Sequence, residues 1–309
     1  GGRVAAKFSD QKVEVGASYV HEEKGAGEGD LYGADVTAKL TPQTTLHAEA
    51  ARTETSYYGT EENGNAYLAE VTHESGKITG NAYYREQQTG FGLDQQTGSG
   101  TGTLKYGARS DYKLTPQLEV AGDAYHQDNL ATGAERDVAE LQGRYASERF
   151  GLHTGLREAR DRFETGEEQR SSQWLLGGNW VTSDHKLNLR GDYEQSLAEK
   201  DENSDCPTLL RWGADYQLTD KVGVFVEQEF SWGAEQNTDG TRAGFNATPW
   251  QGADLRSSVE QQTSENGQRV FALFGLGQSW QVNERWSVDA SIDRSHTIKD
   301  AGSRDFNTN

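Results

Sequence analysis

The sequence lacks methionine altogether and contains only one cysteine and four prolines among its 309 residues. A lone cysteine excludes an intramolecular disulfide framework. Without an initiator methionine, Gly1 is expected to begin a mature chain or a piece of a longer polypeptide. No stretch approaches about 18 consecutive apolar residues, so no transmembrane helix is predicted. Cys206 stands beside Pro207 in an acidic stretch, and we expect its thiol to be exposed to solvent.

Positive charge is also scarce, since 30 Lys and Arg face 49 Asp and Glu and give a net charge of −19. No basic stripe occurs along the chain, which excludes a binder of nucleic acid phosphates. Only 33% of the residues are hydrophobic, a value that together with this charge is typical of disordered chains. The 10% aromatic residues and the 36 glycines argue instead for a folded chain without a thick apolar core.

What the sequence does contain is an alternating strand pattern repeated along its whole length. In "GTLKYGARSDYKL" at 102–114, Leu104 and Tyr106 share one parity, whereas Lys105 and Arg109 share the other. Side chains of a strand alternate between its two faces, so this stretch predicts one apolar face and one charged face. The segments 174–180, 187–194 and 286–293 repeat the pattern.

Two kinds of connection separate these strands. "KLTPQ" occurs at 39–43 and again at 113–117, and similar short turns are expected near residues 10, 42, 75, 116, 148, 184, 220, 249 and 284. Pro42, Pro116 and Pro249 fall inside short turns, where a missing N–H costs no ladder bond. Longer acidic, Gly-rich connections are expected between them, including 21–30, 59–64, 163–170 and 198–205. The spacing predicts an up-and-down meander of about 18 strands.

The predicted strands are long, at roughly 10–14 residues, whereas ordinary strands have about 5–6. A tilted strand needs about 9–11 residues to cross a bilayer, and lipid cannot satisfy an open strand edge. In this pattern the chain resembles the bacterial outer-membrane β-barrel proteins, with a porin-like arrangement over essentially its whole length. The resemblance implies an all-β fold, a large antiparallel up-and-down transmembrane β-barrel, in the outer membrane of a Gram-negative bacterium. It also implies that the short turns face the periplasm.

Residues 1–309 are expected to form a single barrel domain that is a section of a longer polypeptide. An even number of strands places both termini on the side of the long connections, whereas the resemblance implies periplasmic termini. The final strand also lacks the closing aromatic residue that the resemblance implies.

Strand parity assigns a set of charged side chains to the face away from lipid. Such charges are tolerated in a membrane only where they face water or one another. One interpretation is a water-filled lumen whose wall charges select solutes; a compatible alternative is a salt-bridged wall that braces adjacent strands. Acidic residues predominate in the set, which favours cations. The set comprises Lys105, Arg109, Asp111, Glu119, Asp123, Arg157, Arg190, Asp192, Glu227, Glu229, Asp254, Arg256, Glu260, Asp289 and Asp293.

Aromatic residues near the strand ends predict the interfacial belts of a membrane barrel, namely Tyr57, Tyr58, Trp250, Trp280 and Trp286. The alternative is packing beneath loops. The expected partners are outer-membrane lipid and surface glycolipid, together with further domains of the same polypeptide or a surface assembly.

No motif indicates a catalytic, cofactor or metal site. The seven histidines show no zinc-ligand spacing, and the acidic loops lack the spacing of a calcium loop. We therefore expect no enzyme activity and no cofactor. The leading hypothesis is a channel that passes ions or small solutes passively through a polar, acid-leaning lumen. A barrel that anchors or exports a larger surface assembly is the alternative, and a soluble acidic β-protein is the third.

Overall fold

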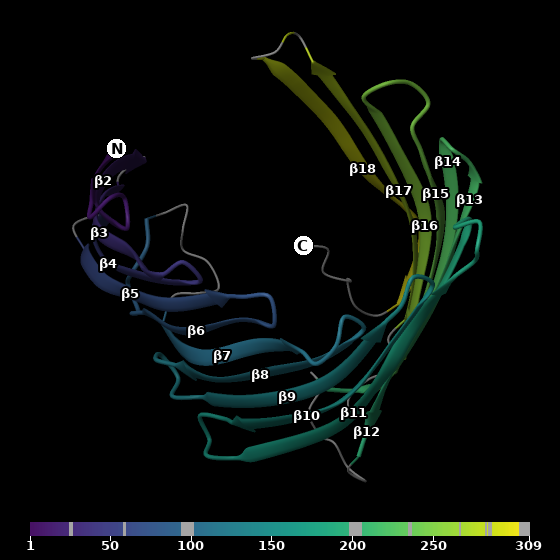
Figure 1. Cartoon of the computed structure of the whole chain (residues 1–309), viewed down its shortest axis with the longest axis horizontal. Helices are drawn as coiled ribbons and strands as arrows, with labels where there is room; N and C mark the ends of the chain where they lie inside the picture. The colour runs from purple at the N-terminus through teal and green to yellow at the C-terminus, as the bar shows by residue number, and fades with distance from the viewer. Residues whose placement is uncertain are drawn as a thin grey trace. The chain divides into compact units, whose positions relative to one another are not determined.

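The computed structural model describes residues 1–24, 27–57, 60–93, 102–197, 206–233, 237–265, 267–281, 283 and 286–302. Within these residues the regular structure consists of strands alone, and all 18 belong to one antiparallel sheet (Figure 1). In the described part of the chain no helix is long and apolar enough to span a membrane.

The chain divides into two compact units. Unit 1 comprises Gly1–Gly143 with Arg157–Arg170, and unit 2 comprises Arg144–Leu156 with Ser171–Asn309. The first nine strands are β1 (Gly2–Phe8), β2 (Val13–Lys24), β3 (Gly27–Thr41), β4 (Thr44–Tyr57), β5 (Thr60–Glu74), β6 (Ile78–Gln87), β7 (Thr103–Lys113), β8 (Leu118–Asn129) and β9 (Glu135–Ala146). The others are β10 (Phe150–Arg162), β11 (Glu168–Val181), β12 (Leu187–Ser196), β13 (Thr208–Thr219), β14 (Val222–Trp232), β15 (Asn237–Ala247), β16 (Ala253–Ser264), β17 (Gly267–Gln281) and β18 (Ser287–Gly302).

All nine predicted short turns connect consecutive strands, so the predicted meander is confirmed. Three of the four long connections named above are shorter than predicted, because the strands continue into the acidic segments. Residues 21–24 and 27–30 pair with each other in β2 and β3, and residues 60–64 belong to β5. Residues 168–170 begin β11, and the predicted connection at 198–205 lies outside the described residues.

The register preserves the alternation of the sequence from strand to strand. Tyr106 on β7 lies opposite Tyr84 on β6 and His126 on β8, whereas Lys105 lies opposite Arg85 and Gln127. A slip of one residue would exchange the two faces of a strand, so matching parity on neighbours fixes the register. Each unit consequently has a polar face, which carries Lys105 in unit 1 and Arg190 in unit 2, and an apolar face on the opposite side.

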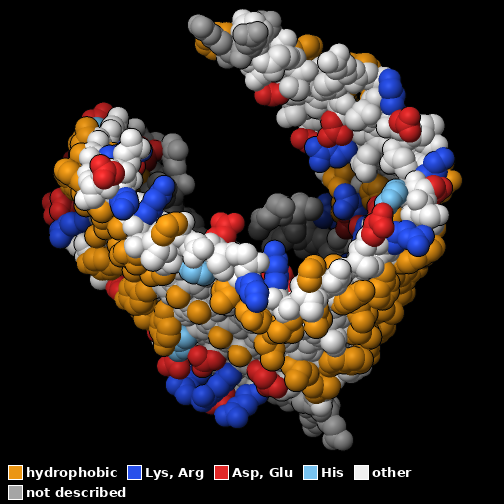
Figure 2. All heavy atoms as spheres, in the orientation of Figure 1, with side chains coloured by type: hydrophobic (Ala, Val, Ile, Leu, Met, Phe, Trp, Pro, Cys, Tyr) orange, Lys and Arg blue, Asp and Glu red, His pale blue; other side chains and the backbone are white. Residues whose placement is uncertain are grey.

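The apolar face is exposed in both units. Tyr106 and Leu141 in unit 1 retain 46% and 61% of their accessible surface, and Leu156 and Trp180 in unit 2 retain 55% and 46%. Figure 2 shows hydrophobic side chains gathered on the surface of each unit. Continuous exposed apolar surface on this scale marks an interaction with an apolar phase or partner rather than with water. The hydrophobic side chains thus lie mainly on this surface and only a few lie in a core.

Some of the few buried side chains lie in connections, and Cys206 is one of them. Cys206 is only 4% exposed, so the prediction of an exposed thiol is wrong. The side-chain amide of Gln173 on β11 donates a hydrogen bond to the carbonyl of Pro207 over 2.8 Å. This bond joins the end of the β12–β13 connection to the polar face of unit 2, next to the buried Cys206.

Candidate functional site

The charged residues that strand parity selected share one face within each unit. In unit 1, Arg109 of β7 lies opposite Asp123 of β8, and Lys113 lies opposite Glu119. Lys105 and Asp111 have the same parity on β7 and therefore point to the same side. Arg157 joins this face through Glu140, whose carboxylate accepts a hydrogen bond from its guanidinium over 2.7 Å.

In unit 2 the cross-strand register connects the remaining nine members of the set. The register connects Arg190 of β12 through Gly213 of β13 to Glu227 of β14. It connects Asp192 in the same way through Arg211 to Glu229. Glu260, Arg256 and Asp254 of β16 share this face through the pairing of Arg242 with Glu260. Arg256 lies opposite Gly275, which in turn lies opposite Asp293, and Asp289 has the parity of Asp293.

A single row of opposed residues forms the centre of the polar face in unit 2. It runs across five strands through Arg190, Gly213, Glu227, Arg242 and Glu260. Arg190 bonds Glu227 across β13 because the position between them is a glycine; an added Cβ would lie 3.0 Å from the guanidinium. Arg242 lies between two carboxylates, 3.8 Å from Glu227 and 4.0 Å from Glu260. Charges of alternating sign therefore cross the sheet at right angles to the strands.

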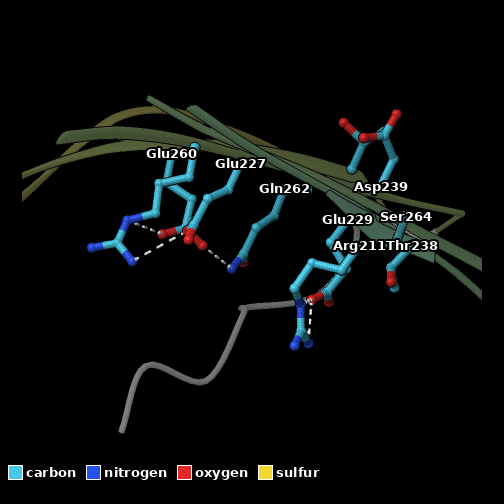
Figure 3. A pocket seen from close by; sticks show the side chains of 11 residues that line it. Arg211, Glu227, Glu229, Thr238, Asp239, Glu260, Gln262 and Ser264 are labelled. Atoms are coloured by element: carbon cyan, nitrogen blue, oxygen red, sulfur yellow. Dashed lines mark hydrogen bonds and ion pairs between the residues drawn. The ribbon is translucent and has the colours of Figure 1, made fainter. Parts of the chain in front are cut away.

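A second row lies one step nearer the long connections. Arg211 donates to Glu229 through Nε over 2.8 Å and through Nη2 over 2.7 Å, and both side chains remain nearly half exposed. Between the two rows the polar face is hollowed by a pocket of about 430 Å³ (Figure 3). Glu227, Glu260 and Gln262 reach into this pocket from one side of the sheet, whereas Asp239 points to the other side (Figure 3). Water-accessible carboxylates and guanidinium groups thus line a polar hollow.

Unit 1 shows the same chemistry in a looser arrangement. Glu70 accepts hydrogen bonds from Asn81 over 3.2 Å and from Arg85 over 3.3 Å. Lys105 lies 3.8 Å above the ring of Tyr125, a cation–π contact on the polar face. A hollow of about 770 Å³ opens near the short turns, and its lining includes Glu70 and Arg109.

Sequence reasoning missed several basic residues of the polar face. Arg85, Arg211 and Arg242 have the same parity as the selected residues on their strands or on paired neighbours. The alternation of side chains that selects Arg190 applies to these three arginines as well. Each of the three contacts a carboxylate on the polar face.

The structure describes the side chains of three of the five aromatic residues predicted to lie at a membrane interface. Trp250, Trp280 and Trp286 flank the β15–β16 and β17–β18 turns and are 55%, 51% and 69% exposed. The indole N–H of Trp250 donates to the side-chain carbonyl of Gln278 over 2.5 Å. Tyr57 ends β4 with its side chain outside the described part, and Tyr58 lies outside the described residues. The three tryptophans therefore lie at one end of their strands, and their contact with a membrane interface remains a prediction.

In the short turn between β11 and β12, two hydrogen bonds shift the pKa of Asp184. The hydroxyl of Thr182 donates to a carboxylate oxygen of Asp184 over 2.5 Å, and the N–H of Lys186 donates to the same oxygen over 3.1 Å. Both bonds favour the charged carboxylate, so they lower the pKa of Asp184 below its usual 3.8. Among the described residues no three His, Cys, Asp or Glu side chains are grouped to hold a metal ion.

Comparisons with known proteins identify the fold. No family model matches the chain, and no curated protein matches it in sequence. The FrpB iron transporter of Neisseria meningitidis superposes with a TM-score of 0.58 at 11% identity, covering 91% of this chain and 64% of FrpB. The alcaligin outer-membrane receptor FauA of Bordetella pertussis gives a TM-score of 0.53 at 13% identity, covering 99% of this chain and 59% of FauA. The chain thus spans 64% and 59% of these two structures.

The likeness concerns architecture alone, since identities of 11% and 13% carry no residue-level correspondence. FrpB is described as an iron transporter and FauA as an outer-membrane receptor. The prediction of an all-β, antiparallel, up-and-down barrel fold is confirmed by the strand order and by these neighbours. The fold of this chain is that of the bacterial outer-membrane β-barrel proteins.

Proposed function

We propose that the chain forms an outer-membrane pore in which charged side chains on the polar sides of the strands line a water-filled lumen. Ions and small solutes would cross it passively. The observation that carries this proposal is the row from Arg190 to Glu260, where charged side chains cross five strands while the opposite face of the same strands is exposed and apolar. A wall with these two faces suits lipid on one side and water on the other.

The exposure of the ion pairs supports a wet lumen over a dry, braced wall. Side chains of the Arg211–Glu229 pair are 49% and 43% exposed, and those of the Arg190–Asp215 pair are 30% and 42% exposed. Pairs that remain in contact with water contribute little to stability, about 0–1 kcal/mol each. Stabilisation of the sheet by ion pairs alone therefore does not explain a polar face that extends over so many strands.

Selectivity follows from the distribution of charge. A solute moving along the polar face of unit 2 meets Glu229 and Glu260, each contacted by one guanidinium group, and Glu227, which is contacted by two. The remaining carboxylate lone pairs stay available to water or to a passing cation. Local fields of both signs favour small hydrophilic solutes, with cations preferred. No covalent step and no conformational cycle is required, and the concentration gradient drives passage.

The exposed apolar faces of the strands also support the proposal. The exposed apolar face would contact outer-membrane lipid, and Trp250, Trp280 and Trp286 would lie at the headgroup level. The chain would accordingly reside in a bacterial outer membrane, where surface glycolipid surrounds the long connections. Metal, cofactor and catalysis have no place in this function.

Conductance of the full-length protein in planar bilayers tests the proposal. We expect stepwise currents whose reversal potential in a salt gradient shows a modest preference for cations. A purified, folded protein that never opens a conducting path would overturn the pore and favour the alternative, a barrel that anchors or exports a larger surface assembly. Recovery in the aqueous phase after membrane fractionation without detergent would contradict both.

A further inference from the structure

The pocket between the two charged rows of unit 2 has a floor without a side chain. The register places Gly240 of β15 between Glu229 of β14 and Gln262 of β16, so a glycine interrupts the second row. A Cβ at Gly240 would meet only the Cβ of Glu229, at 4.0 Å. The space above this glycine is therefore open. The volume of about 430 Å³ lies within the range of small-molecule sites, about 300–1,000 Å³.

Arg242, at the next position of β15 on the same face, has donors without close acceptors. Its guanidinium lies 3.8 Å from Glu227 and 4.0 Å from Glu260, which is beyond hydrogen-bond distance. On another side it lies 5.4 Å from the ring centroid of Phe225. Within the described part of the chain this side chain, 44% exposed, donates no hydrogen bond. Since a guanidinium group presents its donors in a planar fork that fits a carboxylate, Arg242 is available to a carboxylate that enters the pocket.

Glu229 offers the complementary group. Both bonds that it accepts from Arg211 end on Oε2, and among the described residues its Oε1 atom has no partner. Figure 3 shows Glu229 and Arg211 on the same side of the sheet as Glu227 and Glu260. The side chain of Glu229 is 43% exposed, so its free oxygen can accept a hydrogen bond from an ammonium group in the pocket.

The balance of charge on this side of the pocket disfavours solutes of a single sign. Two arginines and three glutamates line it, namely Arg211, Arg242, Glu227, Glu229 and Glu260. An anion that approaches Arg242 also approaches two carboxylates, and a cation that approaches Glu229 also approaches a guanidinium group. A solute with one charge of each sign avoids both repulsions if its charges lie in the same order as those of the wall.

The spacing of the two rows indicates the size of such a solute. Glu229 and Arg242 belong to rows that lie two residues apart along the strands, which corresponds to about 6.8 Å. An extended dipeptide spans at most about 7 Å and has its ammonium and carboxylate groups at opposite ends. The charges of a free dipeptide therefore match the separation of the two rows.

We propose that the pocket binds zwitterionic solutes of dipeptide size, with Arg242 binding their carboxylate and Glu229 their ammonium group. The inference deepens the proposed pore function, on which it rests, because it names the class of solute that the polar face of unit 2 accepts. Both wall groups stay in contact with water, so binding is weak enough for the solute to leave again, as passage requires.

Alanylalanine and two blocked analogues of similar size test the site. The N-acetylated dipeptide carries only the carboxylate, and the dipeptide amide carries only the ammonium group. Ligand-observed NMR titrations of the folded full-length protein in detergent measure their affinities without requiring an open pore. We expect the free dipeptide to bind about fivefold more tightly than either analogue, since it alone satisfies both wall groups.

Substitution of the two wall residues separates the two contacts. Arg242→Gln is expected to weaken binding of the free dipeptide about fivefold and to leave binding of the amide unchanged. Glu229→Gln is expected to weaken binding of the free dipeptide by a similar factor and to leave binding of the N-acetylated dipeptide unchanged. Each variant is thus the control for the other, whereas a general disturbance of the wall would weaken the binding of all three ligands.

Filling the floor of the pocket tests the site without a change of charge. Gly240→Val places a side chain in the open space and is expected to abolish binding of the free dipeptide. Gly277→Val is the matched control, because Gly277 lies opposite Asp254 on the polar face, outside the pocket, and a Cβ there meets nothing closer than 3.8 Å. Folding of every variant is checked by the heat-dependent shift of the barrel in gel electrophoresis.

Conductance of the same preparation in planar bilayers separates the site from the pore. A folded protein that prefers the free dipeptide but conducts nothing overturns the pore and retains the binding site. A conducting protein that binds the free dipeptide no better than its analogues overturns the site alone. Tighter binding of the amide than of the free dipeptide would also overturn it and identify a cation site instead.

Discussion

At the scale of single residues, Glu227 is the carboxylate on which the selectivity of the proposed pore depends most directly. It contacts both Arg190 and Arg242 in the central row of the polar face. Glu227→Gln removes its charge but keeps its size, so both guanidinium groups become less compensated. A unit charge about 8 Å from an ion in water contributes ~0.5 kcal/mol, and we expect the cation-to-anion permeability ratio to fall roughly twofold.

Reversal potentials in a salt gradient measure this change. Asp239→Asn is the matched control, since Asp239 borders the same pocket but points to the opposite side of the sheet (Figure 3). An equal shift in the two variants would show that selectivity does not arise on the polar face of unit 2.

Asp184 links one short turn to the pH dependence of stability. Its pKa is lowered in the folded protein, chiefly by the hydroxyl of Thr182 and then by the N–H of Lys186. A lowered folded-state pKa stabilises the fold fully above the unfolded value near 3.8, and this contribution disappears as the pH falls through the folded value. Asp184→Asn is therefore expected to lower the unfolding temperature at neutral pH and to reduce the loss of stability on acidification below about pH 4.

Unfolding temperatures of the parent and the variant, measured from neutral pH down to about pH 3, check this expectation. Asp220→Asn in the β13–β14 turn is the control. Parallel curves for the parent and Asp184→Asn, offset by a constant amount at every pH, would contradict a contribution from this carboxylate's titration.

Side-chain parity is the residue-level property that sequence reveals best. It placed Lys105, Arg109 and Asp123 together on one face and Arg190 with Glu227 on another, as the registers show. Contacts across a strand are not visible in this way. That Arg190 bonds Glu227 depends on Gly213 between them, and Gln173 bonds the carbonyl of Pro207 although the two residues are far apart in sequence.

At the scale of the elements, the sequence predicted the short turns well and the long connections poorly. The short turns contain Pro42, Pro116 and Pro249, whose chemistry ends a strand. Acidic residues at 21–24 and 27–30 suggested a loop, yet these residues continue β2 and β3. Backbone pairing tolerates charge where side chains bond across the strands, and Tyr19 and His21 both bond the carboxylate of Asp30 over 2.6 and 3.0 Å.

Substitution by arginine is expected to destabilise the protein much more on the apolar face of β9 than on its polar face. Leu141 lies in the middle of β9 on the apolar face and is 61% exposed. Gln142 follows it on the polar face, where its side-chain amide donates to Glu140 over 2.5 Å. Leu141→Arg places a charge against lipid and is expected to cost about 2–4 kcal/mol if the position lies near the bilayer midplane. Gln142→Arg places the same charge toward water and beside a carboxylate, and is expected to cost less than about 1 kcal/mol.

Urea titrations of folding into lipid vesicles measure both values. The two positions are adjacent on one strand and lie at nearly the same depth, so effects of strand and depth cancel in the comparison. Similar losses for Leu141→Arg and Gln142→Arg would mean that the apolar face does not contact lipid.

At the scale of the whole molecule, the sequence predicted the strand number and the fold, whereas the position of Gln88–Leu93 against β5 and β4 had to come from coordinates. Period-two alternation repeated over the chain leaves few alternatives to a meander of long antiparallel strands. The fold-back of Gln88–Leu93 depends instead on Thr53 and Gly64, whose residue types are common in strands of this chain. Long-range packing of a connection leaves no periodic trace, so it could not be predicted.

The alternation of short turns and long connections predicts the orientation of the proposed barrel in the outer membrane. The resemblance to outer-membrane barrels implies that short turns face the periplasm, and Trp250, Trp280 and Trp286 flank two of these turns. An epitope inserted between Thr132 and Gly133, in the β8–β9 connection, is then expected to bind antibody on intact cells. The same epitope between Asp220 and Lys221, in the β13–β14 turn, is expected to bind only after the outer membrane is permeabilised. Both insertions lengthen exposed connections whose backbone lies outside the strand pairing, so folding should tolerate them. Surface exposure of the Asp220 epitope alone would contradict the expected orientation and indicate that the short turns face the outside of the cell.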